Sequence, residues 1–263
     1  MEKIVEIMDK SVIAELFAGW EETLIWSCLQ DCMGRAYGDT RENPRSAQIV
    51  VGDFCFFAGQ PEEALVGNKP DDRESEFIIM VPGSVEWGDL IEKVYQGCSK
   101  KRKRYAIRKE PDVFDKERLR DIVKHCPEGF SLHKIDKETY RQVMENSWSA
   151  DLCSQFKDYE DYRKRGLGVA AFDKKILAAG ASSYTVYKEG IEIEVDTRED
   201  YRRKKLALCC AAQLILDCLE RGLYPSWDAQ NPASVALSEK LGYHFDKEYT
   251  VYEVYKYTRM KKN

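Results

Sequence analysis

Apolar side chains recur at helical intervals over residues 8–32, a pattern that predicts helix near the start of the chain. Gly19 interrupts the pattern, so we expect two helices there rather than one. The positions that carry the pattern are Ile13, Leu16, Phe17, Trp20, Leu24, Ile25 and Cys28.

Further along the chain, short apolar runs predict strands. Residues 47–58 form two apolar runs separated by Gly52 and Asp53, which is typical of a β-hairpin. The rest of the first half predicts a strand over residues 76–81, a helix over residues 85–95 and a short strand over residues 104–107.

The pattern breaks at residues 126–129, Cys-Pro-Glu-Gly, where we place a domain boundary. We expect an N-terminal α/β domain of residues 1–127 and a second domain of residues 128–263. In the second domain the pattern predicts a strand over residues 130–135, helices over residues 137–146 and 149–164, and two strands joined at residues 173–175.

Two stretches of the chain share one plan. Residues 168–180 and residues 47–59 each give an apolar strand, an acidic turn, a second apolar strand and a glycine. Either the N-terminal half is a degenerate relative of the C-terminal half, or two independent hairpins look alike. The sequence leaves both interpretations open.

The composition indicates a globular protein rather than a disordered or repetitive one. The 263 residues are 43% hydrophobic, 11% aromatic and 33% charged, which is enough apolar chain to bury a substantial core. A formal charge of −5 gives no general attraction to nucleic acid, and we expect no such partner. We therefore interpret the basic run over residues 100–104 as a solvated loop entering a strand.

Neither a membrane span nor a signal peptide is expected, because no apolar run approaches about 18 residues and the opening residues 1–6 lack a long apolar stretch. Nine cysteines, three of them inside one apolar helical pattern, indicate buried thiols and a reducing, cytoplasmic compartment. Cys28 and Cys32 lack a second pair of metal ligands nearby, so we expect no metal site.

Carboxylates alternate with apolar residues over residues 191–196, which predicts a strand with three carboxylates on one face. The carboxylates need water, ion partners or a chemical role, so a solvated face and a catalytic face both remain open. They belong to Glu192, Glu194 and Asp196.

A basic loop follows and opens directly onto an apolar segment. Residues 202–205, Arg-Arg-Lys-Lys, precede residues 208–219, which are apolar nearly all the way round and predict a helix buried on most sides. Free backbone N–H groups and the dipole at a helix start both favour negative charge. The loop therefore predicts an anion site that suits a pyrophosphate. After a short predicted strand over residues 224–228, Asn231 with Pro232 is typical of another helix start.

The order of these parts resembles the GNAT superfamily of acyl-CoA-dependent N-acyltransferases over about residues 130–257. The family's acyl-CoA signature is Arg or Gln, two residues, Gly, one residue, and Gly or Ala. It matches residues 202–207, with Lys205 in place of the first glycine. The family's Asn that opens a helix ending in Leu-Gly-Tyr matches Asn231 and residues 241–243. The whole chain is similar to the bacterial group with an N-terminal extension that includes the zwittermicin-resistance acetyltransferase.

The resemblance implies an α/β fold with a mixed, mostly antiparallel sheet. Its two central parallel strands, residues 192–196 and 224–228, would splay apart to hold acetyl-CoA. Amides of residues 203–208 would hold the pyrophosphate. Lys205 would crowd the phosphates, or add a cation if it points outward with a negative φ. The residues assigned to the cofactor are Val195, Arg202, Arg203, Lys204, Lys205, Leu206, Ala207, Asn231 and Ser234.

Acyl transfer to an amine needs a base, an oxyanion donor and an acid for the departing thiolate. Glu194 and Glu192 are the candidate bases, acting directly or through water, and the resemblance makes the Val195 N–H the oxyanion donor. Many family members place a tyrosine acid four residues before the glycine of Leu-Gly-Tyr, where this chain has Ser238. The acid is left open among Tyr243, another residue, a water and none.

We therefore expect an N-acetyltransferase that moves an acetyl group from acetyl-CoA to a primary amine of a small molecule by direct attack. Trp148 and the polar residues after it would line the acceptor pocket. The alternative is a non-catalytic acyl-CoA-binding sensor, which Lys205 and Ser238 keep open. We leave formation of a homodimer open.

Overall fold

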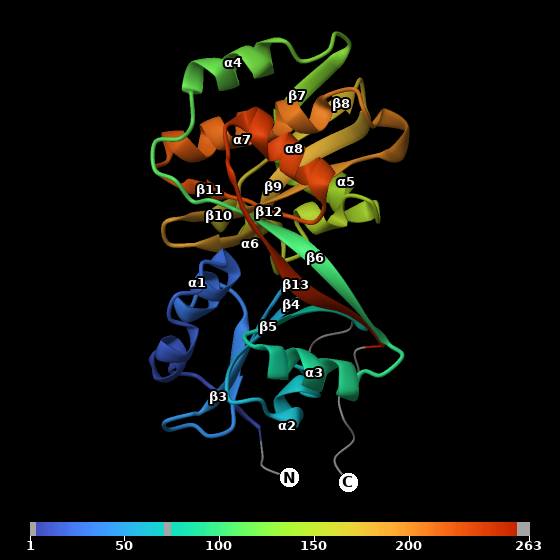
Figure 1. The fold of residues 1–263 in the computed structure, drawn as a ribbon. Helices are drawn as coiled ribbons and strands as arrows, with labels where there is room; N and C mark the ends of the chain where they lie inside the picture. Colours follow the sequence, from blue (N-terminus) through green and yellow to red (C-terminus); the bar gives the residue numbers. More distant parts are fainter. Residues whose placement is uncertain (1–3, 71–74, 257–263) are drawn as a thin grey trace. The chain divides into compact units, whose positions relative to one another are not determined.

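The computed structural model describes residues 4–70 and 75–256 (Figure 1). Residues 1–3, part of the stretch used above to argue against a signal peptide, lie outside the described residues. By compactness the chain divides into two units, residues 1–104 with 248–263, and residues 105–247. These units differ in extent from the expected division at residue 127, because residues 105–127 pack with the second unit. The domains 1–127 and 128–263 stay a prediction.

The first unit holds a mixed sheet in the strand order β1-β2-β3-β4-β5-β13-β6, although residues 105–107 of β6 and residues 245–247 of β13 belong to the second unit. Its strand β4 is parallel to β5, while β1 to β4 pair antiparallel in sequence and β13 pairs antiparallel with β5. The strands are β1 (Val5–Glu6), β2 (Arg35–Gly38), β3 (Ser46–Val51), β4 (Phe54–Gly59), β5 (Phe77–Pro82), β6 (Ser99–Ile107) and β13 (Phe245–Tyr255).

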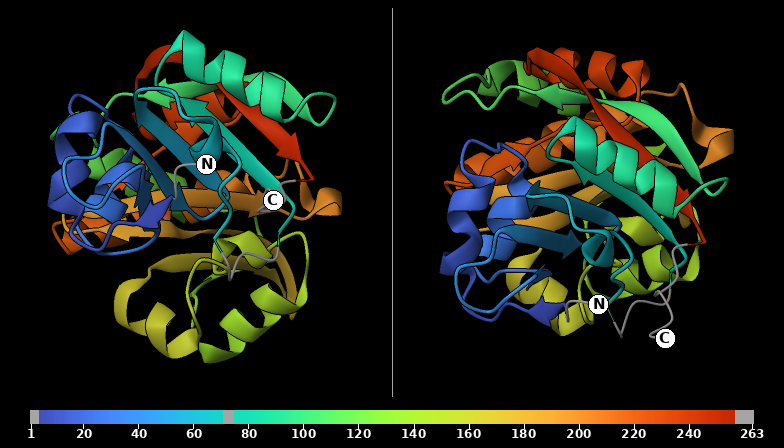
Figure 2. Two further views of the ribbon diagram at one scale, coloured as in Figure 1. Left: turned by 90° about the horizontal axis from the view of Figure 1, so that it is seen from below. Right: turned by 60° about the horizontal axis from the view of Figure 1, so that its bottom comes forward.

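Helices cover this sheet and close its core. The helix α3 packs on β5 and α1 packs on β3 (Figure 2). Phe57 stacks on Trp87 with ring centroids 5.0 Å apart, and both rings are fully buried. The helices are η1 (Lys10–Phe17, a 3-10 helix), α1 (Thr23–Leu29), α2 (Glu63–Val66) and α3 (Val85–Val94).

The pattern over residues 8–32 does form two helical segments, separated near Gly19 at φ = 81°, although the first is a 3-10 helix. The predicted hairpin, strand and helix are confirmed as β3–β4, β5 and α3. Strands β1 and β2 and the short helix α2 were not predicted, because their segments are too short to show a period.

The basic run over residues 100–104 lies inside β6, so the prediction of a loop is wrong. Its cations have partners on β13: Lys103 pairs with Glu248, and Arg102 lies 3.3 Å from Glu253. The neighbour β12 covers only Tyr105 and Ala106 of β6 in the described register. A dense row of Lys and Arg on an otherwise uncovered strand edge disfavours pairing with another chain.

The second unit holds a five-stranded sheet in the order β11-β10-β9-β8-β7, in which only β10 and β11 are parallel. Its strands are β7 (Phe130–Lys134), β8 (Gly168–Asp173), β9 (Ile176–Tyr187), β10 (Gly190–Thr197), β11 (Tyr224–Ser226) and β12 (Asp228–Ala229). Its helices are α4 (Lys116–Lys124), α5 (Lys137–Glu145), η2 (Ala150–Leu152), α6 (Tyr159–Arg165), η3 (Glu199–Tyr201), α7 (Leu206–Glu220) and α8 (Pro232–Leu241).

The helix α7 lies against β8, β9 and β10 on one side and against α4 on the other (Figure 1). Cys210, Leu214 and Cys218 on this helix are fully buried, so the predicted helix buried on most sides is confirmed. None of the chain's cysteines forms a disulfide in the described residues. No helix among those residues is long and apolar enough to cross a membrane.

Two predictions about the second unit need correction. The single helix expected over residues 149–164 is wrong, because the chain forms η2 and then α6, which Asp158 caps by accepting the Asp161 N–H at 2.9 Å. The strand expected over residues 224–228 divides at Trp227, because β12 leaves β11 and pairs with β6.

Candidate active site

The parallel strands β10 and β11 separate after three residue pairs. Their register ends at Glu192 opposite Ser226, with no further pairs in the described residues. The next strand of the chain, β12, pairs instead with β6, where Asp228 lies opposite Ala106. The second half of β10 therefore has an open edge on the side away from β9, as the resemblance predicted.

Two backbone N–H groups face this open edge. Arg198 N–H donates to Ala178 at 3.0 Å, and hydrogen-bonded pairs alternate along an antiparallel ladder. The N–H groups of Val195 and Thr197 consequently point away from β9. In agreement, Val195 N–H donates to its neighbour, the Glu194 carboxylate, at 3.3 Å. The amide assigned as oxyanion donor therefore lies where a thioester could reach it.

The register between β10 and β9 shifts between Glu192 and Ile193, whose partners on β9 are Thr185 and Ser183, so the extra residue of this β-bulge is Tyr184 on β9. Strand β10 itself keeps its alternation, which agrees with the predicted face of three carboxylates, but the surroundings of these carboxylates differ. Glu192 is 6% exposed and lies close to Tyr243, whose pKa is raised by burial and then by Tyr224, Cys218 and Glu192. Asp196 lies instead near Asp151 of η2.

Asp196 has the most informative electrostatic surroundings on β10. Burial and then the nearby Asp151 raise the pKa of its carboxyl, Arg202 opposes both, and the result is a pKa of about 6. The carboxylate is thus ionised at neutral pH but a better proton acceptor than an ordinary aspartate. The structure brings together η2, the end of β10 and the loop before α7.

The start of α7 carries the amides expected to bind pyrophosphate. The first hydrogen bond of the helix runs from Cys209 N–H to Lys205 at 3.1 Å. The six N–H groups of residues 203–208 have no acceptor within the described part of the chain, and no side chain caps the helix. Such a row of amides, with the helix dipole behind it, favours a bound anion.

The loop before α7 adopts left-handed backbone where the family uses glycine. Arg203 and Lys205 both lie at φ = 63°. Alternation of left-handed and ordinary residues turns successive N–H groups toward one side, which makes an anion-binding concavity. The alternative in which Lys205 has a negative φ is therefore excluded, although its side chain is exposed.

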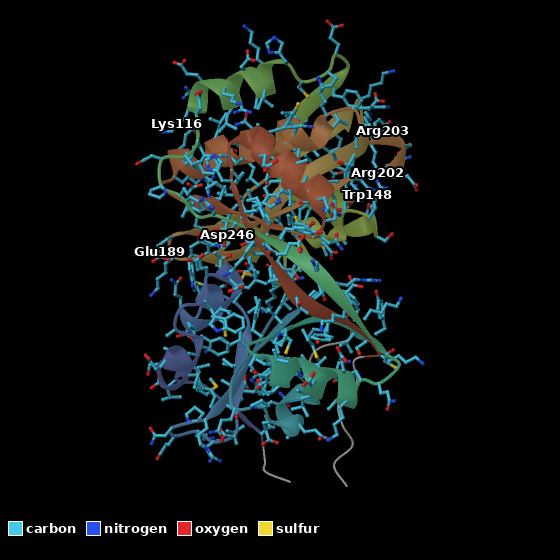
Figure 3. The ribbon with its side chains drawn as sticks, viewed as in Figure 1. Lys116, Trp148, Glu189, Arg202, Arg203 and Asp246 are labelled. Carbon is cyan, nitrogen blue, oxygen red and sulfur yellow. The ribbon has the colours of Figure 1, made fainter. Side chains whose placement is uncertain are left out.

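The four cations of the loop differ in what they contact. Lys204 Nζ lies 4.4 Å from the ring centroid of Tyr201 and 5.9 Å from that of Phe130, so its side chain is occupied by aromatic contacts. Arg202 and Arg203 are exposed and project from the same side of the second unit as Trp148 in the view of Figure 3.

The helix α8 begins as the sequence predicted. The Asn231 side chain accepts the Ser234 N–H at 3.0 Å, and Gly242 ends the helix at φ = 107°. The Ser234 hydroxyl accepts the Trp227 indole N–H at 3.0 Å, so this serine has a structural partner. Asn231 is exposed next to the end of β12. Contact of Asn231 and Ser234 with a cofactor stays a prediction.

The two candidate acids are buried and already donate to backbone carbonyls. Tyr243 OH donates to Pro225 at 2.6 Å, and Ser238 Oγ donates to Val235 at 2.8 Å. Tyr243 is 2% exposed and Ser238 is not exposed at all. These contacts favour structural roles, and a catalytic role for either residue stays a prediction.

Sequence reasoning missed Asp151 as an individual residue. Its position among the polar residues after Trp148 was the available signal. Asp151 lies near Asp196 because η2 packs against β9 and β10, and no local pattern in the sequence reveals this packing.

Comparisons with known proteins cover most of the chain. The family model for GNAT acetyltransferase matches residues 14–252, which include most of the first unit. An uncharacterized N-acetyltransferase of Bacillus subtilis, YdfB, is 26% identical over 251 residues, covering 88% of this chain and 89% of its own length.

Solved structures agree. A GCN5-related N-acetyltransferase-like protein from Streptococcus suis superposes with a TM-score of 0.88 at 44% identity, covering 94% of this chain and 98% of its own. A tandem GNAT protein from the clavulanic acid biosynthesis pathway shares the fold, with a TM-score of 0.56 at 11% identity over 97% of this chain and 98% of its own. The chain belongs to the GNAT acetyltransferase family and is an acyl-CoA-dependent N-acetyltransferase.

Proposed function

We propose that this protein transfers an acetyl group from acetyl-CoA to a primary amine of a small molecule, by direct attack of the amine on the thioester. The observation that carries the proposal is the row of six unengaged amides at residues 203–208, in the same unit as the open edge of β10. Amides of the loop would hold the pyrophosphate. The pantetheine arm would then follow the open edge toward Val195.

The residues of β10 supply the groups that the reaction needs. The Val195 N–H would donate to the oxyanion, and the Glu194 carboxylate that now accepts it would turn aside when the thioester arrives. The ammonium of the acceptor must lose a proton before attack, and the carboxylates of Glu192, Glu194 and Asp196 are the groups on this strand able to take it. Because Tyr243 and Ser238 donate to carbonyls, the thiolate would receive its proton from the attacking nitrogen or from water.

The first unit would be a degenerate relative of the second. In each unit an antiparallel strand leads into a strand that is joined through a helix to a parallel neighbour, and another helix follows. We further propose a cytoplasmic bacterial enzyme without a nucleic-acid partner. The bacterial relatives and the net charge of −5 support this view.

A direct assay tests the proposal. Purified protein is mixed with acetyl-CoA and a panel of polyamines, amino acids and aminoglycoside-like amines, and release of CoA thiol is followed. Release that depends on the amine supports the transferase. Tight CoA binding in calorimetry without turnover on any amine would favour the sensor, and absence of CoA binding would contradict both.

A further inference from the structure

We infer that Asp196, rather than Glu192 or Glu194, takes the proton from the acceptor ammonium, and that Asp151 is the positioning residue that tunes it. The inference rests on the proposed acetyl transfer and names the base within it. It is carried by the separation of the three carboxylates of β10 into different surroundings.

Glu192 is buried at the end of β10 that stays paired, where Ser226 of β11 lies opposite it. Its side chain is 6% exposed, and its carboxylate lies near Tyr243 and Tyr187, whose pKa values it helps to raise after burial. Its partner across the ladder is Thr185, which is fully buried. A carboxylate enclosed in this way has no path to an incoming amine.

Glu194 lies too close to the oxyanion donor to serve as the base. Its Oε1 accepts the Val195 N–H at 3.3 Å, which is the bond that the reacting carbonyl must replace. An anionic carboxylate that remained there would repel the developing oxyanion. Once the thioester displaces the Glu194 carboxylate from the Val195 N–H, this hydrogen bond no longer fixes the position of the carboxylate.

Asp196 follows Val195 directly and lies on the part of β10 that β11 leaves open. Its partner across the ladder is Gly180, and a Cβ at Gly180 would meet Leu152 Cδ1 at 2.6 Å. The missing side chain thus lets Leu152 pack against β9 and seats η2 there. Asp151, one residue earlier on η2, is thereby held next to Asp196.

The charges around Asp196 come from three elements. Asp151 on η2 repels its negative charge, Arg202 in the loop before α7 attracts it, and Glu194 lies two positions earlier on β10. With burial, the balance gives the carboxyl a pKa of about 6. A base with this pKa is ionised at pH 7 and accepts protons more readily than a surface carboxylate.

The proton and electron transfers balance. The ammonium gives one proton to the Asp196 carboxylate, which later releases it to water. The nitrogen lone pair then forms the C–N bond, the carbonyl electrons move to the oxygen beside the Val195 N–H, and their return breaks the C–S bond. A second proton passes from the nitrogen to the sulfur, giving the amide and CoA thiol.

The experiment measures kcat and kcat/KM against pH for the wild type, Asp196→Asn, Glu194→Gln and Glu192→Gln, with the best amine from the assay above. We expect Asp196→Asn to lower kcat by about 100-fold or more, and the two glutamate variants to lose less. Calorimetry with CoA and thermal unfolding check that each variant binds the donor and folds. The wild-type rate should fall below a pH of about 6 as Asp196 is protonated.

Asp151→Asn and Gly180→Ala test the positioning role by two routes. Removing the Asp151 charge, or pushing Leu152 and η2 off the sheet, should move the acid limb of the pH profile to lower pH. Glu160→Gln, an exposed change on α6, is the matched control and should leave the limb in place. A role in holding η2 alone would alter stability or KM without moving the limb.

The outcomes separate the two proposals. A wild type that releases thiol while Asp196→Asn keeps its rate within tenfold overturns the assignment of the base and leaves the acetyl transfer standing. An unmoved acid limb in Asp151→Asn overturns the tuning by Asp151. A wild type with no amine-dependent turnover overturns the proposed function and the inference together.

Discussion

Each unit contains one pair of parallel strands joined through a helix, but only one of the two pairs opens. In the first unit β4 and β5 stay paired over four positions, from Phe54 to Phe57. In the second, β10 and β11 separate after Glu192, and β12 pairs with β6. The same order of elements therefore makes a closed sheet in one unit and an open edge in the other.

The helices that connect the parallel strands, α2 and α7, also differ in length and in the charge at their starts. The helix α2 has four residues and begins at Glu62 and Glu63, whereas α7 has fifteen and follows four consecutive cations. Glu62 also accepts the Ala64 N–H at 3.2 Å, so the start of α2 already holds an anion of its own. Such a start would repel a pyrophosphate, and this difference supports the proposal that the donor binds in the second unit.

Reversing the charge of the donor loop should give the largest effect. Arg203→Glu combined with Lys205→Glu makes this helix start acidic like that of α2, and we expect CoA affinity to fall by about 100-fold or more, about 3 kcal/mol. Calorimetry with CoA measures it. The matched control, Glu62→Gln with Glu63→Gln in the first unit, should leave the affinity unchanged. An equal loss in both variants would remove the distinction between the units.

Asp196→Asn should stabilise the fold at high pH. Because the folded-state pKa of Asp196 is raised to about 6, its ionised form costs stability above pH 6, and the cost disappears below the unfolded pKa of about 4. Urea unfolding should show a gain of about 1–3 kcal/mol at pH 8 that shrinks between pH 6 and pH 4. Asp89→Asn, on the exposed side of α3, is the control and should change little. A gain that grows in acid would contradict the burial of Asp196.

Two tyrosines, one in each unit, follow a helix and donate to a backbone carbonyl, so they allow a close comparison of the units. Tyr95 follows α3 and donates to Val66 at 3.1 Å, and Tyr243 follows α8 and donates to Pro225 at 2.6 Å. Replacing either by Phe leaves a buried carbonyl without its donor and should cost about 1 kcal/mol of unfolding free energy. Turnover per folded molecule should stay within a few-fold in both. A selective collapse of kcat in Tyr243→Phe would restore Tyr243 as the acid.

The smallest expected effect concerns the left-handed lysine. Lys205→Gly relieves the backbone strain at φ = 63° and should raise stability by about 0.5–1 kcal/mol, while CoA affinity changes less than about threefold. Lys174→Gly, at φ = 55° in the β8–β9 turn, should stabilise the protein by a similar amount and leave CoA affinity unchanged. A large loss of CoA affinity in Lys205→Gly alone would indicate that the Lys205 side chain, rather than the backbone amides, binds the donor.

Features with a local physical cause were predictable from the sequence. The buried helix α7, the helix start at Asn231 and its end at Gly242 follow from apolar runs and capping chemistry within a few residues. The proposed anion site rests on the same signals, because basic residues and a helix start adjoin in the chain.

Features that depend on distant partners were not predictable. The bulge at Tyr184 of β9 arises from pairing with β10, and β13 is a strand because it joins β5 some 170 positions earlier, as Tyr252 lies opposite Met80. Asp151 reaches Asp196 through the packing of Leu152 on Gly180. The sequence similarity between residues 47–59 and residues 168–180 relates β3–β4 to β8 and the start of β9. In the two sheets, however, β3–β4 corresponds to β9–β10, so the similar stretches occupy different positions.

The central claim is that main-chain amides of residues 203–208 bind the diphosphate of CoA, and that the first unit has no such site. A titration of the isotope-labelled protein with CoA, followed by the NMR signals of its backbone amides, tests this most directly. Saturable shifts should appear at residues 203–208 and be absent at residues 60–66. Unshifted amides at the start of α7, or matching shifts at the start of α2, would contradict the account.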